Sequence, residues 1–234
     1  MKLGTLRWLS TLAVVFGLVQ VANAEIMITE LRTKSQFDPE DYFELTNTGA
    51  AAVDITGWKF DDESADLAEA AALEGITSIV PGESVVFFQL ATADAAADET
   101  VFRDAWGGLS GVQVGYYDGA GLGKGDTINL FDAGDNLVLT LKYGVSSPEE
   151  THAGDWAAGN FDGSDTYENQ SAVWVPGSDP QQFVLAAPGV LGSFADSMGD
   201  YGSPGSVGAV PEPATCLLAG LALAGLVAVR KRLA

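Results

Sequence analysis

Short stretches rich in apolar, β-branched and aromatic residues run through residues 25–145, turn-forming residues separate them, and apolar and polar residues alternate at 41–47. An alternation with a period of two is typical of β-strands that bury one face. Turns are indicated at 47–49, 81–83 and 132–136, where Gly, Pro, Asn or Asp gather. The stretches predicted as strands are 26–29, 41–47, 53–55, 58–60, 84–88, 127–131 and 137–141. The pattern therefore predicts an all-β domain, most simply a β-sandwich.

Helical patterns are sparse in the same region. Residues 66–73 are rich in alanine, and residues 94–106 have a composition that accommodates one or two helical turns. Neither stretch is long enough to change the predicted fold class.

The stretch from residue 146 to residue 208 has a different composition. It is rich in Gly, Ser, Asp and Ala and has no periodic hydrophobic pattern of its own. We interpret it as loops packed on the sandwich, with Trp156, Trp174 and Phe183 as anchors. The predicted domain thus spans residues 25–208, with a core at 25–145 and a loop-rich extension at 146–208.

The first 24 residues have the pattern of a secretory signal peptide. Lys2 and Arg7 precede a mostly apolar run, and Ala22-Asn23-Ala24 supplies the small residues that signal peptidase selects. This pattern predicts an N-terminal signal helix that is cleaved after Ala24.

The C-terminus carries a second apolar segment. Residues 214–229 contain no charge and are followed at once by Arg230, Lys231 and Arg232. At about 1.5 Å per residue a helix over this segment is about 24 Å long, a short but workable membrane span. A basic tail stays on the cytoplasmic side, so we expect a transmembrane helix with residues 25–210 outside the inner membrane.

The order of features at this end resembles a PEP-CTERM sorting signal. Pro211, Glu212 and Pro213 stand directly before the apolar segment and its basic tail, and residues 209–234 make up the whole signal. The resemblance implies processing by exosortase, a membrane protease of Gram-negative bacteria. It also implies delivery to the cell envelope, outer surface or extracellular matrix, often beside exopolysaccharide.

The strands themselves resemble those of the lamin-tail domain family. The resemblance rests on the runs 28–31, 41–47, 53–60, 81–84 and 125–132 and on a closing Gly-Ser-Pro-Gly at 202–205. It implies an immunoglobulin-like β-sandwich. Turn chemistry and core packing then give the motif residues structural roles. Those residues are Glu44, Asn47, Gly57, Trp58, Pro81 and Gly82.

Charge and composition exclude several classes of function. The chain has 11 Lys and Arg against 32 Asp and Glu, a formal net charge of −21. Residues 25–210 hold six of the basic and 31 of the acidic side chains, a net charge of −25. Nucleic-acid binding needs clustered cations, so it is not expected. A single Cys and a single His exclude an intramolecular disulfide and sites with several thiolates or imidazoles.

No catalytic motif is present. His152 is the only His, it lies in a polar stretch, and no G-x-S-x-G, H-E-x-x-H or P-loop pattern occurs. Acidic residues are abundant, but nothing in the sequence selects a pair for a hydrolase. The protein is therefore expected not to be an enzyme, with an exported carboxylate-dependent hydrolase as the alternative.

Calcium is the one cofactor that the acidic residues suggest. It takes six to eight oxygen ligands, and the weak candidates are Asp61, Asp62, Asp162 and Asp165. None follows the EF-hand register, so a solvated acidic surface is favoured and a calcium-stabilised adhesion module stays an alternative. The sequence thus predicts a non-catalytic exported envelope or matrix protein that contacts polysaccharide or other matrix proteins.

Overall fold

The computed structural model of the chain describes most of the predicted domain. The described residues are 25–33, 41–62, 64–119, 121–123, 126–143, 145–147, 150–151, 170–178 and 181–207. The two predicted terminal segments, together with Trp156, Asp162 and Asp165, lie outside these ranges. Within them, no helix has both the length and the apolar character that a membrane crossing requires.

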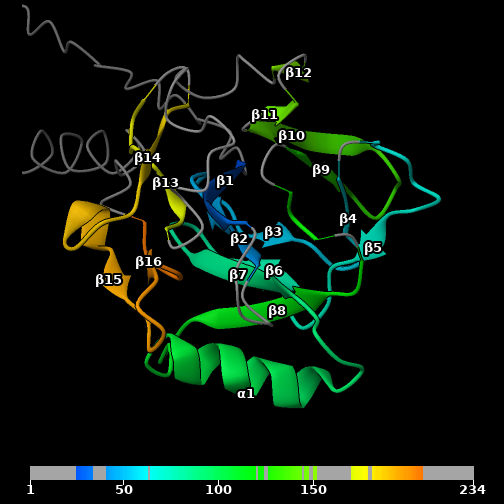
Figure 1. Cartoon of the computed structure of the whole chain (residues 1–234). Helices are drawn as coiled ribbons and strands as arrows, with labels where there is room; N and C mark the ends of the chain where they lie inside the picture. Colours follow the sequence, from blue (N-terminus) through cyan, green and yellow to red (C-terminus); the bar gives the residue numbers. More distant parts are fainter. Residues whose placement is uncertain are drawn as a thin grey trace, which may run out of the picture.

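The larger sheet of the described chain has six strands (Figure 1). In spatial order they are β14 (Phe183–Leu185), β13 (Ala172–Trp174), β1 (Ile26–Arg32), β2 (Tyr42–Asn47), β7 (Ser84–Gln89) and β8 (Gln113–Tyr117). All neighbours are antiparallel except β7 and β8, which run parallel.

A four-stranded sheet faces it, and short pairs of strands join the described elements at the edges. The second sheet contains, in spatial order, β10 (Leu137–Tyr143), β9 (Asp126–Phe131), β4 (Lys59–Asp61) and β5 (Ala71–Ala72). The short pairs are β3 (Val53–Asp54) with β6 (Ser78–Ile79), β11 (Val145–Ser147) with β12 (Glu150–Thr151), and β15 (Phe194–Ala195) with β16 (Tyr201–Gly202). One 3₁₀ turn, η2 (Val190–Gly192), precedes β15.

The main core lies between the two sheets. Phe43 on β2 has its ring centroid 5.3 Å from that of Phe60 on β4, and Phe60 lies 4.8 Å from Tyr117 on β8. These rings are almost fully buried, as are Ile128 and Leu130 on β9. Aromatic contacts of this kind hold the inner faces together. The predicted all-β class is confirmed.

A helix, α1 (Ala95–Ala105), covers the outer face of the larger sheet beside β7 and β8 (Figure 1). It is the crossover that parallel pairing of β7 and β8 requires. Asp94 caps its first turn by accepting a hydrogen bond from the backbone N–H of Ala97. Phe102 and Trp106 pack against Tyr42 and Phe88 in a second apolar cluster. The helix has 11 residues, more than the one or two turns expected. Its hydrophobic pattern is weak, and packing against the sheet stabilises it.

Two other expectations differ from the structure. The alanine-rich stretch 66–73 is not helical, since it forms turns and then β5. β8 was not predicted, because Gly115 interrupts its pattern.

The extension contributes strands to the larger sheet and not loops alone. β13 pairs with β1, and β14 pairs with β13, so residues distant in the chain complete the sheet. Trp174 and Phe183, predicted as anchors, are both buried. Each of these strands has three residues, too few to show an alternation in the sequence.

Candidate functional site

The predicted motif residues organise turns at the ends of strands. Asn47 donates from Nδ2 to the carbonyl oxygens of Ala51 (2.7 Å) and Ile79 (2.9 Å), and its Oδ1 accepts from the backbone N–H of Gly49 (3.0 Å). The backbone N–H of Gly82, which follows Pro81, donates to the Asn47 carbonyl (2.8 Å). One buried amide therefore ties three segments together, which explains an Asn at this position.

Gly57 and Trp58 form the entry to β4. Gly57 has φ +76°, a left-handed conformation that strains residues with a Cβ. Trp58 directly follows and is buried at the edge of the main core. The pair lies before β4 and not within it, but Trp58 packs inward as expected.

Two of the calcium candidates serve a turn in the structure. The buried Asp61 accepts hydrogen bonds at Oδ2 from Ser64 Oγ (2.7 Å) and from the backbone N–H of Asp66 (2.8 Å). The carbonyl oxygen of the neighbouring Asp62 accepts a hydrogen bond from Asn129 Nδ2. The described part of the chain brings together no group of three or more His, Cys, Asp or Glu side chains suited to a metal ion.

The outer face of the larger sheet carries a sealed carboxylate pair, Glu30 on β1 and Glu44 on β2. The two residues are direct cross-strand partners, and neither is exposed to solvent. The pairing register shifts between Ile28 and Glu30, which marks a β-bulge. The bulge brings Thr29 to Glu44 as well, so consecutive polar residues of β1 serve one polar cluster.

Glu30 is surrounded by donors. Its Oε1 accepts from Tyr42 Oη (2.5 Å), from the backbone N–H of Ser203 (2.8 Å) and from Ser171 Oγ, and its Oε2 accepts from Ser203 Oγ (2.7 Å). Burial raises the pKa of Glu30, and the hydrogen bonds from Ser171, Tyr42 and Ser203 oppose that rise. The donors thus compensate the cost of burying this carboxylate.

Glu44 has a smaller set of donors. Its Oε1 accepts from Thr29 Oγ1 (2.5 Å) and its Oε2 from the backbone N–H of Gly205 (2.6 Å). Burial raises the pKa of Glu44 to about 8, with the charge of Glu30 adding to the rise. Thr29 Oγ1 also bonds Thr46 Oγ1 (2.7 Å), which bonds Ser84 Oγ (2.6 Å). A chain of hydroxyls therefore connects Glu44 to Ser84 at the start of β7.

Residues 200–206, here called the closing segment, form the lid over this pair. Ser203 and Gly205 donate to Glu30 and Glu44, and Asp200 forms an ion pair with the buried Arg32 of β1. Gly202 has no room for a side chain, because a Cβ there would lie 2.6 Å from Tyr42 Oη and 2.7 Å from the Trp106 ring. Gly202, the first residue of the closing Gly-Ser-Pro-Gly motif, therefore has a packing role.

Sequence reasoning placed Glu44 in a structural motif but did not single out Glu30. In an alternating strand, polar positions are normally assigned to solvent. The one feature of the sequence that could indicate a buried acceptor is the distant Gly-Ser-Pro-Gly motif, because its backbone N–H groups need hydrogen-bond acceptors.

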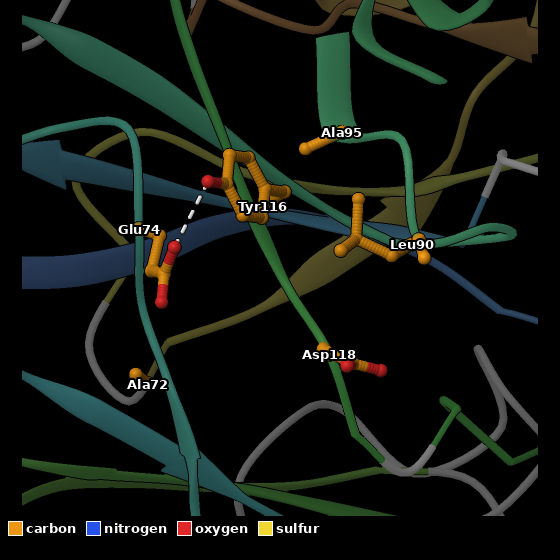
Figure 2. Close-up of a pocket in the computed structure, with 7 residues that line it drawn as sticks. Ala72, Glu74, Leu90, Ala95, Tyr116 and Asp118 are labelled. Atoms are coloured by element: carbon orange, nitrogen blue, oxygen red, sulfur yellow. Dashed lines mark hydrogen bonds between the residues drawn. The ribbon is translucent and has the colours of Figure 1, made fainter. Parts of the chain in front are cut away.

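An open cleft lies at the edge of the larger sheet that β8 forms (Figure 2). Its volume is about 360 Å³, and Figure 2 shows Tyr116 and Asp118 between two walls, Ala72 and Glu74 on one side and Leu90 and Ala95 on the other. Ala93 completes the lining. Glu74 and Asp118 are exposed, and Tyr116 is half-buried. We call this site the Tyr116 cleft.

The first wall of the Tyr116 cleft is pinned to β8. Glu74 and Tyr116 exchange two backbone hydrogen bonds (2.9 and 3.0 Å), and Tyr116 Oη donates to Glu74 Oε2 (2.9 Å). Gly115 makes this approach possible, since a Cβ there would lie 2.4 Å from the Glu74 carbonyl oxygen. The hydrogen bond to Glu74 is the main cause that raises the pKa of the Tyr116 phenol.

The second wall is held by Asp98 of α1. This buried carboxylate accepts from the backbone N–H groups of Ala91 (3.0 Å) and Thr92 (2.7 Å) and from Thr92 Oγ1 (3.0 Å). The loop that follows Leu90 is therefore fixed to α1, which begins at Ala95. A cleft with fixed walls is preorganised to receive a ligand.

The electrostatic character of the cleft is negative. Glu74 Oε1 and the Asp118 carboxylate accept no hydrogen bond from any residue that the structure describes, and no Lys or Arg belongs to the described lining. The rest of the described lining is apolar, from Leu90 and three alanines. No local pattern in the sequence indicates the cleft, because its lining comes from three separate segments, 72–74, 90–95 and 116–118.

Comparison with protein families gives two matches. The model of the Lamin Tail Domain family matches residues 20–145, and that of the PEP-CTERM protein-sorting motif matches residues 209–232. A comparison with curated proteins gives no match. The sorting motif implies an exported protein that exosortase processes. Because the first match covers more than half of the chain, the protein belongs to the lamin tail domain family and carries a C-terminal PEP-CTERM sorting motif.

Proposed function

We propose that the protein is a non-catalytic display module of the cell envelope or extracellular matrix of a Gram-negative bacterium. Signal peptidase removes residues 1–24, the C-terminal helix holds the chain in the inner membrane, and exosortase then releases or transfers the sandwich. Its role is to contact exopolysaccharide or other matrix proteins. The observation that carries the proposal is the sorting motif at 209–232, which follows almost directly on the closing segment of the sandwich.

The use of the buried acidic residues supports a non-catalytic role. Glu30 and Glu44, the carboxylates with raised pKa values, are sealed beneath the closing segment and hydrogen-bonded to it. Perturbed carboxylates usually suggest catalysis when they line a cleft. Both side chains are fully buried, and desolvation accounts for the direction of their pKa shifts.

The test is the intact mass of the protein from a host that contains exosortase. We expect a product that lacks residues 1–24 and the C-terminal segment, recovered from the envelope or medium. A variant with Pro211→Ala and Glu212→Ala is expected to remain longer and membrane-bound. An uncleaved chain confined to the cytoplasm would overturn the proposal, and turnover of polysaccharides or phosphodiesters by the purified protein would overturn its non-catalytic part.

A further inference from the structure

The Tyr116 cleft combines three properties that a ligand must match. Its floor presents an aromatic ring, its walls present short apolar side chains, and its rim presents the carboxylates of Glu74 and Asp118. The carboxylates lie among described residues that offer them no cation. The volume of about 360 Å³ is near the lower end of ligand sites, which commonly span about 300–1,000 Å³.

A metal ion fits this arrangement poorly. Calcium takes about six to eight oxygen ligands. Glu74 already accepts the Tyr116 hydroxyl, and the described residues include no third acidic side chain grouped with Glu74 and Asp118 for a metal ion. The apolar wall from Leu90 and the alanines adds no ligand either.

An organic cation on an apolar stem matches all three properties. Arg and Lys lay their methylene stems along apolar surface and keep the charged head at a polar rim. A guanidinium or ammonium group is attracted to the face of an aromatic ring and to carboxylates. The net charge of −25 over residues 25–210 draws such a group toward the protein from a distance.

We propose that the Tyr116 cleft binds an Arg or Lys side chain presented by a basic segment of a partner protein. The stem lies against Leu90 and Ala95, and the head lies between Glu74 and Asp118 over Tyr116. This inference rests on the proposed function and specifies the class of partner that the displayed sandwich contacts. The fixed walls lower the entropic cost of binding one side chain.

The experiment measures binding of a fluorescent peptide that contains a single Arg, using the full chain in a non-ionic detergent at low salt. The comparison peptide replaces Arg with citrulline, which has nearly the same shape and no charge. We expect the Arg peptide to bind more tightly, and we expect added salt to weaken it. Equal binding of both peptides would overturn the proposal.

Matched variants separate the cleft from the general negative charge of the protein. Glu74→Gln together with Asp118→Asn is expected to weaken binding about five- to tenfold. Tyr116→Leu is expected to weaken it about three- to fivefold through loss of the ring. Asp135→Asn is the control for charge, since Asp135 lies in the β9–β10 turn and its left-handed φ of +62° suits Asn. Glu74→Gln alone and Asp118→Asn alone are each compared with Asp135→Asn, since each removes one charge. Equal losses of affinity from the three variants would show attraction to the whole surface and overturn the cleft assignment.

Thermal melting of each variant checks that the fold is retained. A glucosamine oligomer and a neutral glucan are tested as competitors. If either sugar binds in the cleft and the Arg peptide does not, the partner is a polysaccharide and the inference is wrong. That result would leave the proposed function intact, whereas a failure of export or processing appears only in the intact-mass experiment.

Discussion

Two pairs of carboxylates on the larger sheet and its flanks show how the same chemistry is put to opposite uses. Glu30 and Glu44 lie on central strands, are closed off from water, and receive hydrogen bonds from the closing segment. Glu74 and Asp118 line the Tyr116 cleft at the edge strand β8 and are exposed. Each pair even has a tyrosine partner, Tyr42 for Glu30 and Tyr116 for Glu74.

The difference teaches that the supply of donors decides the role of an acidic residue. A buried carboxylate must be neutralised or surrounded by donors, so the sealed pair commits distant parts of the chain to one geometry. An exposed carboxylate is satisfied by water and retains acceptor sites for a ligand. The sealed pair is therefore a stability element, and the open pair is a binding element.

The largest effect is expected from removing Glu30. In Glu30→Ala the hydroxyls of Tyr42 and Ser171 and both donors of Ser203 lose their acceptor inside the protein. We expect the free energy of unfolding to fall by about 3–5 kcal/mol, because each buried donor left without an acceptor costs about 1–3 kcal/mol. Urea denaturation followed by tryptophan fluorescence measures the change.

Glu74→Ala is the matched control for that variant. Because Glu74 is exposed, its replacement is expected to change the free energy of unfolding by no more than about 0.5 kcal/mol. Glu30→Gln provides a milder variant should Glu30→Ala fail to fold. Similar losses for Glu30→Ala and Glu74→Ala would contradict the distinction between the two pairs.

The next effect concerns pH. The pKa of Glu44 is raised from 4.5 to about 8, so the folded state retains a proton that the unfolded chain releases above pH 4.5. Stability from this group is therefore complete below about pH 4.5 and is lost as the pH rises toward about 8, on the order of 1 kcal/mol per pH unit. Glu44→Gln cannot release a proton and should make the profile less steep, with its largest advantage over the parent above pH 8; the raised pKa of Glu30 accounts for part of the slope that remains.

Repulsion among the many surface carboxylates also lowers stability as the pH rises. Added salt screens that repulsion but has little influence on a buried group. We therefore expect the slope that Glu44→Gln removes to persist in about 0.5 M salt. A parent profile that salt flattens completely would assign the pH dependence to the surface instead.

The smallest effect comes from the two tyrosine hydroxyls. Tyr42→Phe removes a buried hydrogen bond to a carboxylate and is expected to cost about 1.5–3 kcal/mol. Tyr116→Phe removes an exposed bond of the same type, and we expect about 0.5 kcal/mol or less. The melting temperatures of Tyr42→Phe and Tyr116→Phe are compared, since each variant removes a single hydroxyl. A larger loss of stability in Tyr116→Phe would contradict the distinction between the buried and the exposed pair.

The sequence was sufficient for the strands of the sandwich that are rich in apolar residues and bounded by turn residues. The strands β2, β7, β9 and β10 follow runs rich in β-branched, aromatic and other apolar residues that turn residues bound, and Trp58 and Phe183 were expected inside because no other placement suits such large apolar groups. β8, β13 and β14 were not predicted. Gly115 breaks the pattern of β8, and three residues are too few for a periodicity in β13 or β14.

The candidate sites depended on the tertiary structure. Glu30 and Glu74 stand in sequence contexts that suggest exposure equally well, and only the folded chain brings the closing segment over Glu30 and leaves Glu74 open. Local pattern and composition determined the strand-rich character, the export signals and the acidic surface, because each arises from residues close together in the chain. Burial of a polar side chain depends on which distant donors reach it, so the tertiary structure alone decided which carboxylates stabilise the fold and which face a ligand.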